Sequence, residues 1–477
     1  MTRTPFRSGA AAPDPEAAPG DAEARRYERR LLLVLFAAFG FVFFDRQALT
    51  FLAPFISDDF HLSHTALGVL SGVLALTWAL SGLVCGRLAD RYGRRPVLIA
   101  AVVLFSCFSA AGGLMTGFAG LLIARALMGL AEGAVLPLAQ SLMVEASREH
   151  RRGLNMGLLQ GSSAGLLGGI VAPLVVVWIA EHHNWRTAFL VTIVPGLLIA
   201  VWIVRSVRER PPVPVLPDVS DATGAGTSGT AGDTAVDTAS GTADGPADAG
   251  AREEAAPPLR EVLREVLTHR NIVLCALAAC SYLTWFTVVI TFTPTYLEDE
   301  KGFSSSTMSH VMTCFGVAWV LWGFLTPAVS DRIGRRGALI AFTVVAALCP
   351  LAVVYVDNPV LLGGVVVLTY TGLGCFTLIM ATIPAETVPR RTLTVALGLV
   401  MGVGELAGGF IGPLVAGLAS DVWGLDAAMF ISSGGAVAVV LLALGLRETA
   451  PAVLRRRGAD AGPAHDAIPV STSEGAI

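Results

Sequence analysis

The sequence predicts an all-α membrane protein with twelve transmembrane helices in two six-helix bundles. Its composition, twelve apolar stretches and an internal repeat predict this architecture. Of the 477 residues, 54% are hydrophobic and 15% are charged, whereas soluble domains carry about a quarter charged residues. The mean hydropathy is +0.66. We therefore expect lipid to surround most of the chain, and the net charge of -4 indicates no nucleic-acid partner.

Twelve apolar stretches are long enough to cross a bilayer, which takes roughly 20 residues of helix. We expect the first to be a true span and not a cleaved signal, because charges interrupt it and residues 1–30 mix Pro, Asp, Glu and Arg. The predicted spans are residues 31–56, 65–87, 96–116, 120–144, 154–180, 187–204, 271–297, 307–329, 337–356, 360–383, 393–420 and 426–446.

Positive charges orient these spans, because Lys and Arg near span ends stay on the cytoplasmic side. With the N-terminus inside, 29 of the 33 Lys and Arg residues fall in seven cytoplasmic segments. Arg186 and Lys301 fall on the other side, and Arg46 and Arg125 lie within spans. We therefore expect a multi-pass protein of the cytoplasmic membrane with both termini in the cytoplasm.

A linker separates the two predicted bundles. Within it, residues 212–256 are rich in Pro, Gly, Ala, Ser, Thr and Asp, a composition that cannot bury enough surface to fold and predicts disorder. The amphipathic stretch Leu259–Leu267 is expected to lie on the membrane surface. The predicted organisation is an N-terminal tail (1–30), a first bundle (31–204), the linker (205–270), a second bundle (271–446) and a C-terminal tail (447–477).

A repeat relates the two halves at an offset of 241 residues. Residues 86–95 read Gly-Arg-Leu-Ala-Asp-Arg-Tyr-Gly-Arg-Arg, and residues 327–336 read Pro-Ala-Val-Ser-Asp-Arg-Ile-Gly-Arg-Arg. Glu145 and Glu386, at the ends of spans four and ten, keep the same offset. The duplication therefore extends through the helices between them.

This repeated motif resembles the signature of the major facilitator superfamily between spans two and three. The short loop allows Asp90 to approach helix N-termini of the other half, and Arg94 or Arg95 to reach Glu145. The resemblance implies a latch that holds the bundles together in the outward-open state. The expected gating residues are Gly86, Asp90, Arg91, Gly93, Arg94, Arg95, Glu145, Asp331, Arg332, Gly334 and Glu386.

Four ionisable residues lie near mid-span in the first half: Asp45, Arg46, Arg125 and Glu132. Charges at membrane depth are costly unless they are paired or face a cavity, so they are candidates for function. Arg125 and Glu132 share a helix face with Gly129 between them, which predicts an open patch for a ligand. Asp45 and Arg46 are adjacent, so at most one faces the cavity squarely. Cross-pairs such as Arg46 with Glu132 would satisfy these charges.

The second half lacks these four charges. At the 241-residue offset, their positions hold Phe286, Thr287, Val366 and Leu373. A charge network needed only for the fold would be expected in both halves, so the asymmetry favours a ligand site over the alternative of a structural ion-pair network. Glu405 in span eleven is a fifth such charge, and it could either couple protons to transport or form a hydrogen bond that packs helices together.

The residues Phe44-Asp45-Arg46-Gln47 and the span-four segment 125–133 resemble the anion:cation symporter family, with a weaker likeness to spinster-like transporters. The resemblance implies that Arg46 and Arg125 bind a substrate carboxylate and that Asp45 and Glu132 couple protons, a role we extend to Glu405. Further candidates for contact with substrate are Gln140, Gln160, Tyr282, Tyr370, Thr287 and Thr291.

The charge count independently favours an anion. With both acids ionised the four charges sum to zero, and protonating one acid leaves a net charge of +1 that attracts a carboxylate together with its proton. The predicted function is proton-coupled import of an organic anion by alternating access in a monomer. An exporter of amphipathic solutes and a membrane solute sensor are the alternatives.

An enzyme is not expected, because the sequence shows no catalytic grouping, metal cluster or phosphate loop, and no cofactor is indicated. The cysteines are expected to pack within helices. The eight histidines lie at loops or span ends and are expected to be solvated.

Overall fold

The computed structural model describes residues 19–208, 259–450 and 453–454. The predicted disorder at 212–256 lies outside these residues. In the described part of the chain, twelve helices are long and apolar enough to cross a membrane, and they match the twelve predicted spans. The all-α prediction is confirmed, because the described residues are almost entirely helical.

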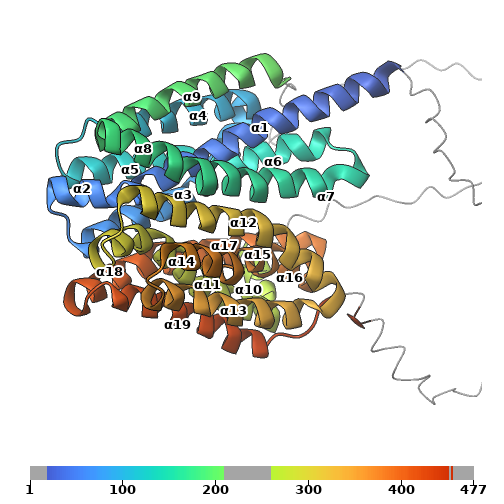
Figure 1. Cartoon of the computed structure of the whole chain (residues 1–477). Coiled ribbons are helices and arrows are strands. Elements are labelled where there is room, and N and C mark those ends of the chain that lie inside the picture. Colours follow the sequence, from blue (N-terminus) through green and yellow to red (C-terminus); the bar gives the residue numbers. More distant parts are fainter. Residues whose placement is uncertain (1–18, 209–258, 451–452, 455–477) are drawn as a thin grey trace, which may run out of the picture.

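Two bundles, one from each half of the chain, lie side by side (Figure 1). In the labels, η marks a π-helical segment. The first bundle holds α1 (Pro19–Phe51), α2 (Ala53–Phe60), α3 (His64–Tyr92), α4 (Arg94–Gly112), α5 (Phe118–Glu132), α6 (Val135–Ala146), α7 (Glu149–Gly157), η1 (Leu158–Ser162), η2 (Ala164–Val171), α8 (Ala172–His182) and α9 (Trp185–Ser206).

The second bundle has the same order of spans. It holds α10 (Leu259–Thr268), α11 (Arg270–Thr295), η4 (Tyr296–Glu300), α12 (Ser305–Ile333), α13 (Arg335–Tyr355), α14 (Pro359–Thr369), α15 (Leu373–Thr377), η5 (Leu378–Thr382), α16 (Ile383–Thr387), α17 (Arg390–Gly404), η6 (Glu405–Ile411), α18 (Gly412–Trp423) and α19 (Asp426–Leu444).

The repeated motif forms the same tight connection in each bundle. Gly93 joins α3 to α4 with φ 88°, and Gly334 joins α12 to α13 with φ 101°. Such positive φ values favour glycine, since a side chain is strained there. The matching backbone explains why glycine stands at both positions of the repeat.

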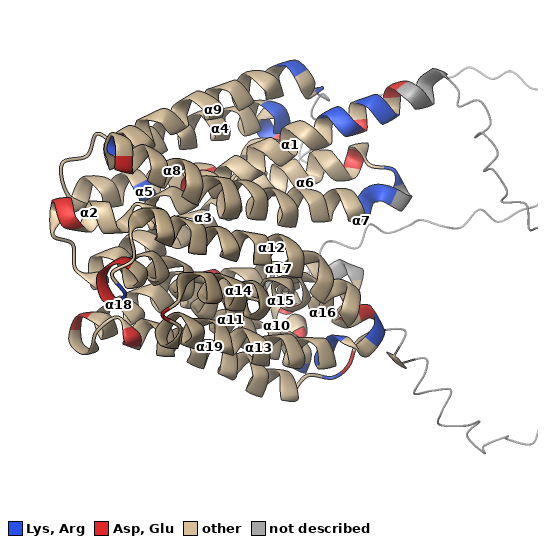
Figure 2. Cartoon of the chain, viewed as in Figure 1, with Lys and Arg blue, Asp and Glu red and all other residues tan. Residues whose placement is uncertain are grey.

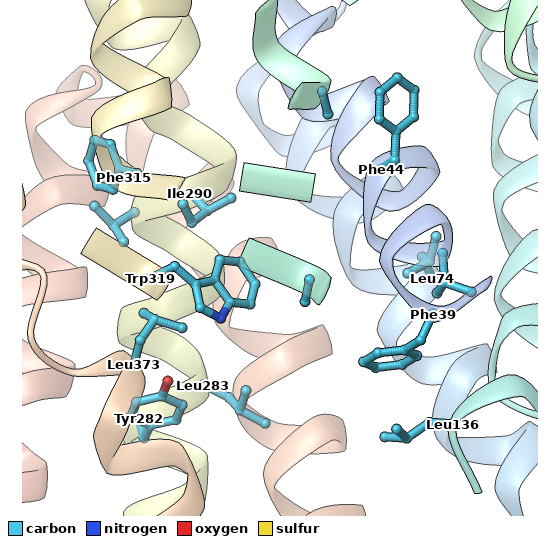
Figure 3. Packing of buried hydrophobic residues seen from close by; sticks show 14 of the residues in the cluster. Phe39, Phe44, Leu74, Leu136, Tyr282, Leu283, Ile290, Phe315, Trp319 and Leu373 are labelled. Carbon is cyan, nitrogen blue, oxygen red and sulfur yellow. The ribbon is translucent and has the colours of Figure 1, made fainter. Parts of the chain in front are cut away.

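Buried apolar side chains fill both bundles (Figure 3). Phe39 and Leu136 belong to the first bundle, and Tyr282 and Phe315 to the second. Aromatic rings also meet across the boundary between bundles, where Phe43 lies edge-on to Trp319 with ring centroids 5.4 Å apart. The two cores are therefore continuous at this level of the molecule.

The two ends of the molecule differ in charge (Figure 2). We call the end with the α3–α4 and α12–α13 connections the basic end, because Lys and Arg gather there. We call the opposite end, which holds the α4–α5 and η4–α12 connections, the distal end. The positive-inside rule predicts that the basic end faces the cytoplasm.

The bundles meet closely in their distal halves, where α3 contacts α18 and η6, and α12 contacts η2 and α8. Glycines make this approach possible. A Cβ atom at Gly68 would lie 2.2 Å from the carbonyl oxygen of Pro413, and one at Gly316 would lie 2.2 Å from backbone atoms of Gly169. Larger residues at these positions would force the bundles apart.

A carboxylate joins the bundles at the distal end. Asp421 of α18 accepts hydrogen bonds from the backbone amides of His64 (2.8 Å) and Thr65 (3.0 Å), and from the Thr65 hydroxyl (2.5 Å). His64 Nδ1 lies 3.1 Å from the same carboxylate. Asp421 thus caps α3 of the other bundle, where a negative charge is favourable. The expectation that all histidines are merely solvated is wrong for His64. We call this contact the distal latch.

We predict that Asp421→Ala loosens the distal end. Losing a capping carboxylate costs about 1–2 kcal/mol, roughly a 5- to 30-fold change in an opening equilibrium. The measurement is maleimide labelling of a cysteine at Thr50, a buried α1 residue, in a background free of other cysteines. Labelling from the distal side should become faster.

The control is Asp59→Ala, which removes an acid at the same end that pairs with Arg186 (2.6 Å) inside the first bundle. Equal labelling rates in the Asp421 and Asp59 variants would contradict the latch.

Candidate functional site

A small cavity lies between the bundles. Its cationic side comes from the first bundle, and its opposing wall, of aromatic, aliphatic and threonine side chains, comes from α11 of the second. The lining residues are Arg46, Gln47, Thr50, Ser71, Leu74, Arg125, Phe286, Thr287, Ile290 and Thr291. The predicted residues Arg46, Arg125, Thr287 and Thr291 are thus brought together.

Arg46 and Asp45 point in different directions from α1, as adjacent helical residues do. Arg46 is half-buried and lines the cavity. Its guanidinium lies 5.8 Å from the ring centroids of both Phe43 and Trp78, a cation–π arrangement that positions it without neutralising its charge.

Asp45 is fully buried and turns toward Ser109 of α4 and Thr192 of α9. The hydroxyls of Ser109 and Thr192 lie 3.2 Å from each other. Neither carboxylate oxygen of Asp45 has a hydrogen-bond partner among the described residues. Burying a carboxylate without a hydrogen-bond partner is costly, which makes Asp45 a candidate proton acceptor.

Arg125 is held at the cavity by the backbone of its neighbour. Its Nη2 donates to the carbonyl oxygen of Arg46 at 3.0 Å, and Nη1 lies 3.7 Å from the sulfur of Met128. One hydrogen bond to α1 therefore places the two guanidinium groups at the same cavity. Arg125 is 4% exposed, so its charge is screened little by water.

Glu132 is fully buried, and both of its oxygens lack a hydrogen-bond partner in the described part of the chain. It lies within Coulombic range of Arg46 and Arg125. Among the described residues, however, no salt bridge connects any two of these four charges. The predicted direct cross-pairs are therefore wrong: the helices keep the charges near one another without contact.

The expected open patch at Gly129 is also wrong. A Cβ atom there would lie 2.2 Å from the Thr77 hydroxyl and 2.7 Å from the carbonyl oxygen of Leu74. Gly129 is glycine because α3 packs directly against it. Sequence spacing put Arg125, Gly129 and Glu132 on one face but could not show that α3 covers the middle of that face.

Four predicted substrate residues lie away from the cavity lining. The Gln140 amide donates to Gln160 at 3.4 Å. Tyr282 and Tyr370 are buried in the aromatic core of the second bundle, both against Trp285, with ring centroids 5.6 and 5.1 Å from it. Both tyrosine rings are thus packed inside the second bundle.

The cavity also contains residues that sequence reasoning did not select: Gln47, Thr50, Ser71, Leu74, Phe286 and Ile290. Gln47 and Thr50 follow Arg46 by one and four positions, and a residue four positions along a helix lies on the same face. The four-residue spacing from Arg46 could therefore have predicted that Thr50 lines the cavity. Ser71 and Leu74 come from α3, whose approach to α1 the sequence does not show.

The predicted gating residues lie at the basic end, where the ion pairs seen between described gating residues join residues of the same bundle. Arg94 pairs with Glu145. Arg335 contacts Glu386 (3.0 Å) and Asp331 (2.5 Å). The Arg94 part of the expected latch is thus present.

Asp90 is exposed and forms no hydrogen bond or ion pair with any described residue. Its expected contact with helix N-termini of the other half is not made in this structure. The exposed Arg91 lies over the ring of Tyr92 at 5.4 Å.

The chain is similar in sequence to known transport proteins. Residues 35–410 and 274–472 match the family described as Major Facilitator Superfamily. The hexuronate transporter of Bacillus subtilis (strain 168) is 26% identical over 90% of this chain and 97% of its own. The D-galactonate transporter of Escherichia coli O6:H1 is 25% identical over 88% and 95%. The 4-hydroxybenzoate transporter of Pseudomonas putida is 31% identical over 38% and 41%.

Solved structures share the fold. A bacterial homolog of the human lysosomal transporter Spinster, inward-facing and unoccupied, has a TM-score of 0.62 at 20% identity, covering 88% of this chain and 95% of its own. The D-xylose-proton symporter has a TM-score of 0.66 at 16% identity, covering 89% and 98%.

The packing at Gly129 predicts that Gly129→Ala destabilises the protein by about 1–3 kcal/mol, because overpacking a close helix contact outweighs the better helix propensity of alanine. The matched control is Gly161→Ala, where a Cβ atom meets no described atom within 4 Å. Thermal unfolding in detergent measures both. Equal loss of stability in the two variants would show that the α3–α5 contact is not tight.

Proposed function

The chain belongs to the major facilitator superfamily and is a multi-pass transporter of the cytoplasmic membrane, and from this premise we propose that it imports a small organic anion together with protons. The observation that carries the proposal is the cavity with two guanidinium groups, Arg46 and Arg125, neither of which forms an ion pair with a carboxylate of the described residues. An anionic substrate would supply the missing partner.

A carboxylate suits this cavity for reasons of shape and charge. A guanidinium is planar, stays charged, and offers paired N–H donors that match the two oxygens of a carboxylate. Arg46 has a guanidinium free of ion pairs with described residues. Opposite it, Thr287 and Thr291 offer hydroxyl oxygens while Phe286 and Ile290 offer apolar surface. The remainder of a small acid would face this mixed wall.

Proton coupling follows from the two buried acids. Asp45, Arg46, Arg125 and Glu132 sum to zero when both acids are ionised. One proton on Asp45 or Glu132 leaves a net positive site, so proton and anion each favour the other's binding. The lack of hydrogen-bond partners on these carboxylates among the described residues supports their readiness to accept protons.

Alternating access uses the two ends of the bundle interface. The distal latch and the glycine contacts close one end, while Asp90 at the basic end is exposed. With the basic end in the cytoplasm, this arrangement corresponds to the inward-facing state. In the opposite state the distal contacts separate, and Asp90 approaches the second bundle.

The relatives support the substrate class. The full-length matches are named as carriers of hexuronate and D-galactonate, and a partial match as a carrier of 4-hydroxybenzoate. Each of these compounds pairs a carboxylate with a ring or a hydroxylated chain. We therefore propose a sugar acid or related carboxylate as the substrate.

Arg125→Ala should lower uptake of labelled D-glucuronate, D-galactonate or 4-hydroxybenzoate into proteoliposomes by about 30-fold or more. Removing one partner of a desolvated charge pair costs roughly 2–5 kcal/mol. Arg186→Ala, which removes a distal arginine paired with Asp59, is the control. Uptake that is unchanged in the Arg125 variant would overturn the site assignment.

Glu132→Gln should separate anion transport from proton coupling, because the carboxamide imitates the protonated acid. Wild-type binding should strengthen as pH falls, since a proton adds positive charge to the site. In the variant, anion exchange across the membrane should persist while accumulation driven by a proton gradient is lost. Parallel counterflow and gradient-driven uptake measure this. Gradient-driven accumulation at the wild-type level would exclude Glu132 as the coupling acid.

A further inference from the structure

Glu405 is a buried carboxylate at the boundary between the bundles. It begins the π-helical segment η6 in span eleven, is 5% exposed, and its Oε2 has no hydrogen-bond partner among the described residues. π-Helical turns inside α-helices are rare and occur frequently at functional sites. At the 241-residue offset the first bundle has Ala164, so this charge, like those of the cavity, is not duplicated.

The glycines of span eleven direct Glu405 toward the other bundle. Gly404 and Gly408 pack against α11, where their Cβ atoms would lie 2.9 Å from Ala279 and 2.3 Å from the carbonyl oxygen of Cys280. Gly409 lies on a different face, where its Cβ atom would be 2.7 Å from Glu405 Oε2 and 3.1 Å from Ala75 of α3. The carboxylate therefore lies in the seam between η6 and α3.

This seam adjoins the cavity. Ala75 follows Leu74, which lines the cavity, and precedes Trp78, whose ring lies beside the Arg46 guanidinium. Arg46 is the charged group within Coulombic range of Glu405 in the described structure. Of the titratable groups on α11, the Cys280 thiol donates to Ala276 (3.2 Å) and Val403 (3.6 Å), and Tyr282 lies in the aromatic cluster of its own bundle.

A carboxylate in this position is stable only with a positive partner or a proton, because an unpaired charge at membrane depth costs several kcal/mol. While the cavity is empty, Arg46 supplies this positive charge at Coulombic range, without a direct ion pair. A substrate carboxylate bound at Arg46 would compete with Glu405 for the same positive charge. Binding of the anion therefore favours uptake of a proton by Glu405.

We propose that Glu405 is a tethered counter-anion for Arg46, which the substrate carboxylate displaces across the bundle seam. This inference rests on the proposed anion transport. When the substrate arrives, Glu405 takes up one proton, becomes neutral and no longer attracts Arg46. Because Arg46 of α1 and Glu405 of η6 belong to different bundles, their attraction draws the two bundles together across the seam, and neutralising Glu405 loosens the distal half of the interface.

The test compares Glu405→Gln with Glu300→Gln, an exposed acid of the same bundle that serves as the matched control. Binding of D-glucuronate, D-galactonate and 4-hydroxybenzoate to the purified full-length protein is measured by calorimetry at about pH 5.5 and about pH 7.5. Glu405→Gln should tighten binding at the higher pH by about 5- to 100-fold, the usual range of coupling between sites, and should reduce the difference between the two pH values.

A second readout needs no ligand. Spin labels at Leu114 and Val360, exposed residues on the distal sides of the two bundles, report the distal separation in a background without the seven native cysteines. Without ligand at the higher pH, Glu405→Gln should show a larger population of long distances than wild type or Glu300→Gln.

The two readouts separate this inference from the proposed function. If wild type binds none of the three acids, the proposed function fails, and the distance distribution alone decides the role of Glu405. If wild type binds an acid but Glu405→Gln leaves affinity, pH dependence and distal distances unchanged, the counter-anion is overturned while anion transport stands.

Discussion

The helices around the cavity hold four charged side chains close to one another without allowing an ion pair between any two of these described residues. Inside a membrane this arrangement is costly, because a direct ion pair would recover part of the lost hydration. A protein that needed these charges only for helix packing would gain stability if they formed direct ion pairs. Because the four side chains form no direct ion pairs with one another, the guanidinium groups remain available to a ligand and the carboxylates to protons.

The distances between the four charged side chains depend on how the helices are spaced. Gly129 brings α5 onto α3, which fixes Arg125 and Glu132 at either end of a covered contact. The hydrogen bond from Arg125 to the Arg46 carbonyl then ties α5 to α1. Rigid backbone contacts thus determine the distances between charges, so small shifts of these helices change the electrostatics of the whole cavity.

Much of this was predictable from sequence because it depends on local pattern. Hydropathy located the spans, and helical geometry placed Asp45 and Arg46 on different faces. The distal latch was not predictable, because 357 residues separate His64 from Asp421 and only the tertiary fold brings them together. Tyr282 and Tyr370 were wrongly predicted to contact substrate. An aromatic residue in a span packs equally well in a bundle core or a cavity wall, and only the tertiary fold decides between them.

Glu405 and Ala164 begin π-helical segments at equivalent positions of the two halves. The unusual winding is therefore a property of both copies, whereas the carboxylate belongs to one. This is explained most simply if the ancestral six-helix unit already contained the underwound turn before the gene duplicated. The acid then arose, or was kept, in a single descendant half. In that account the backbone feature precedes the carboxylate, and substitution on a symmetric frame produced the asymmetry between the two halves.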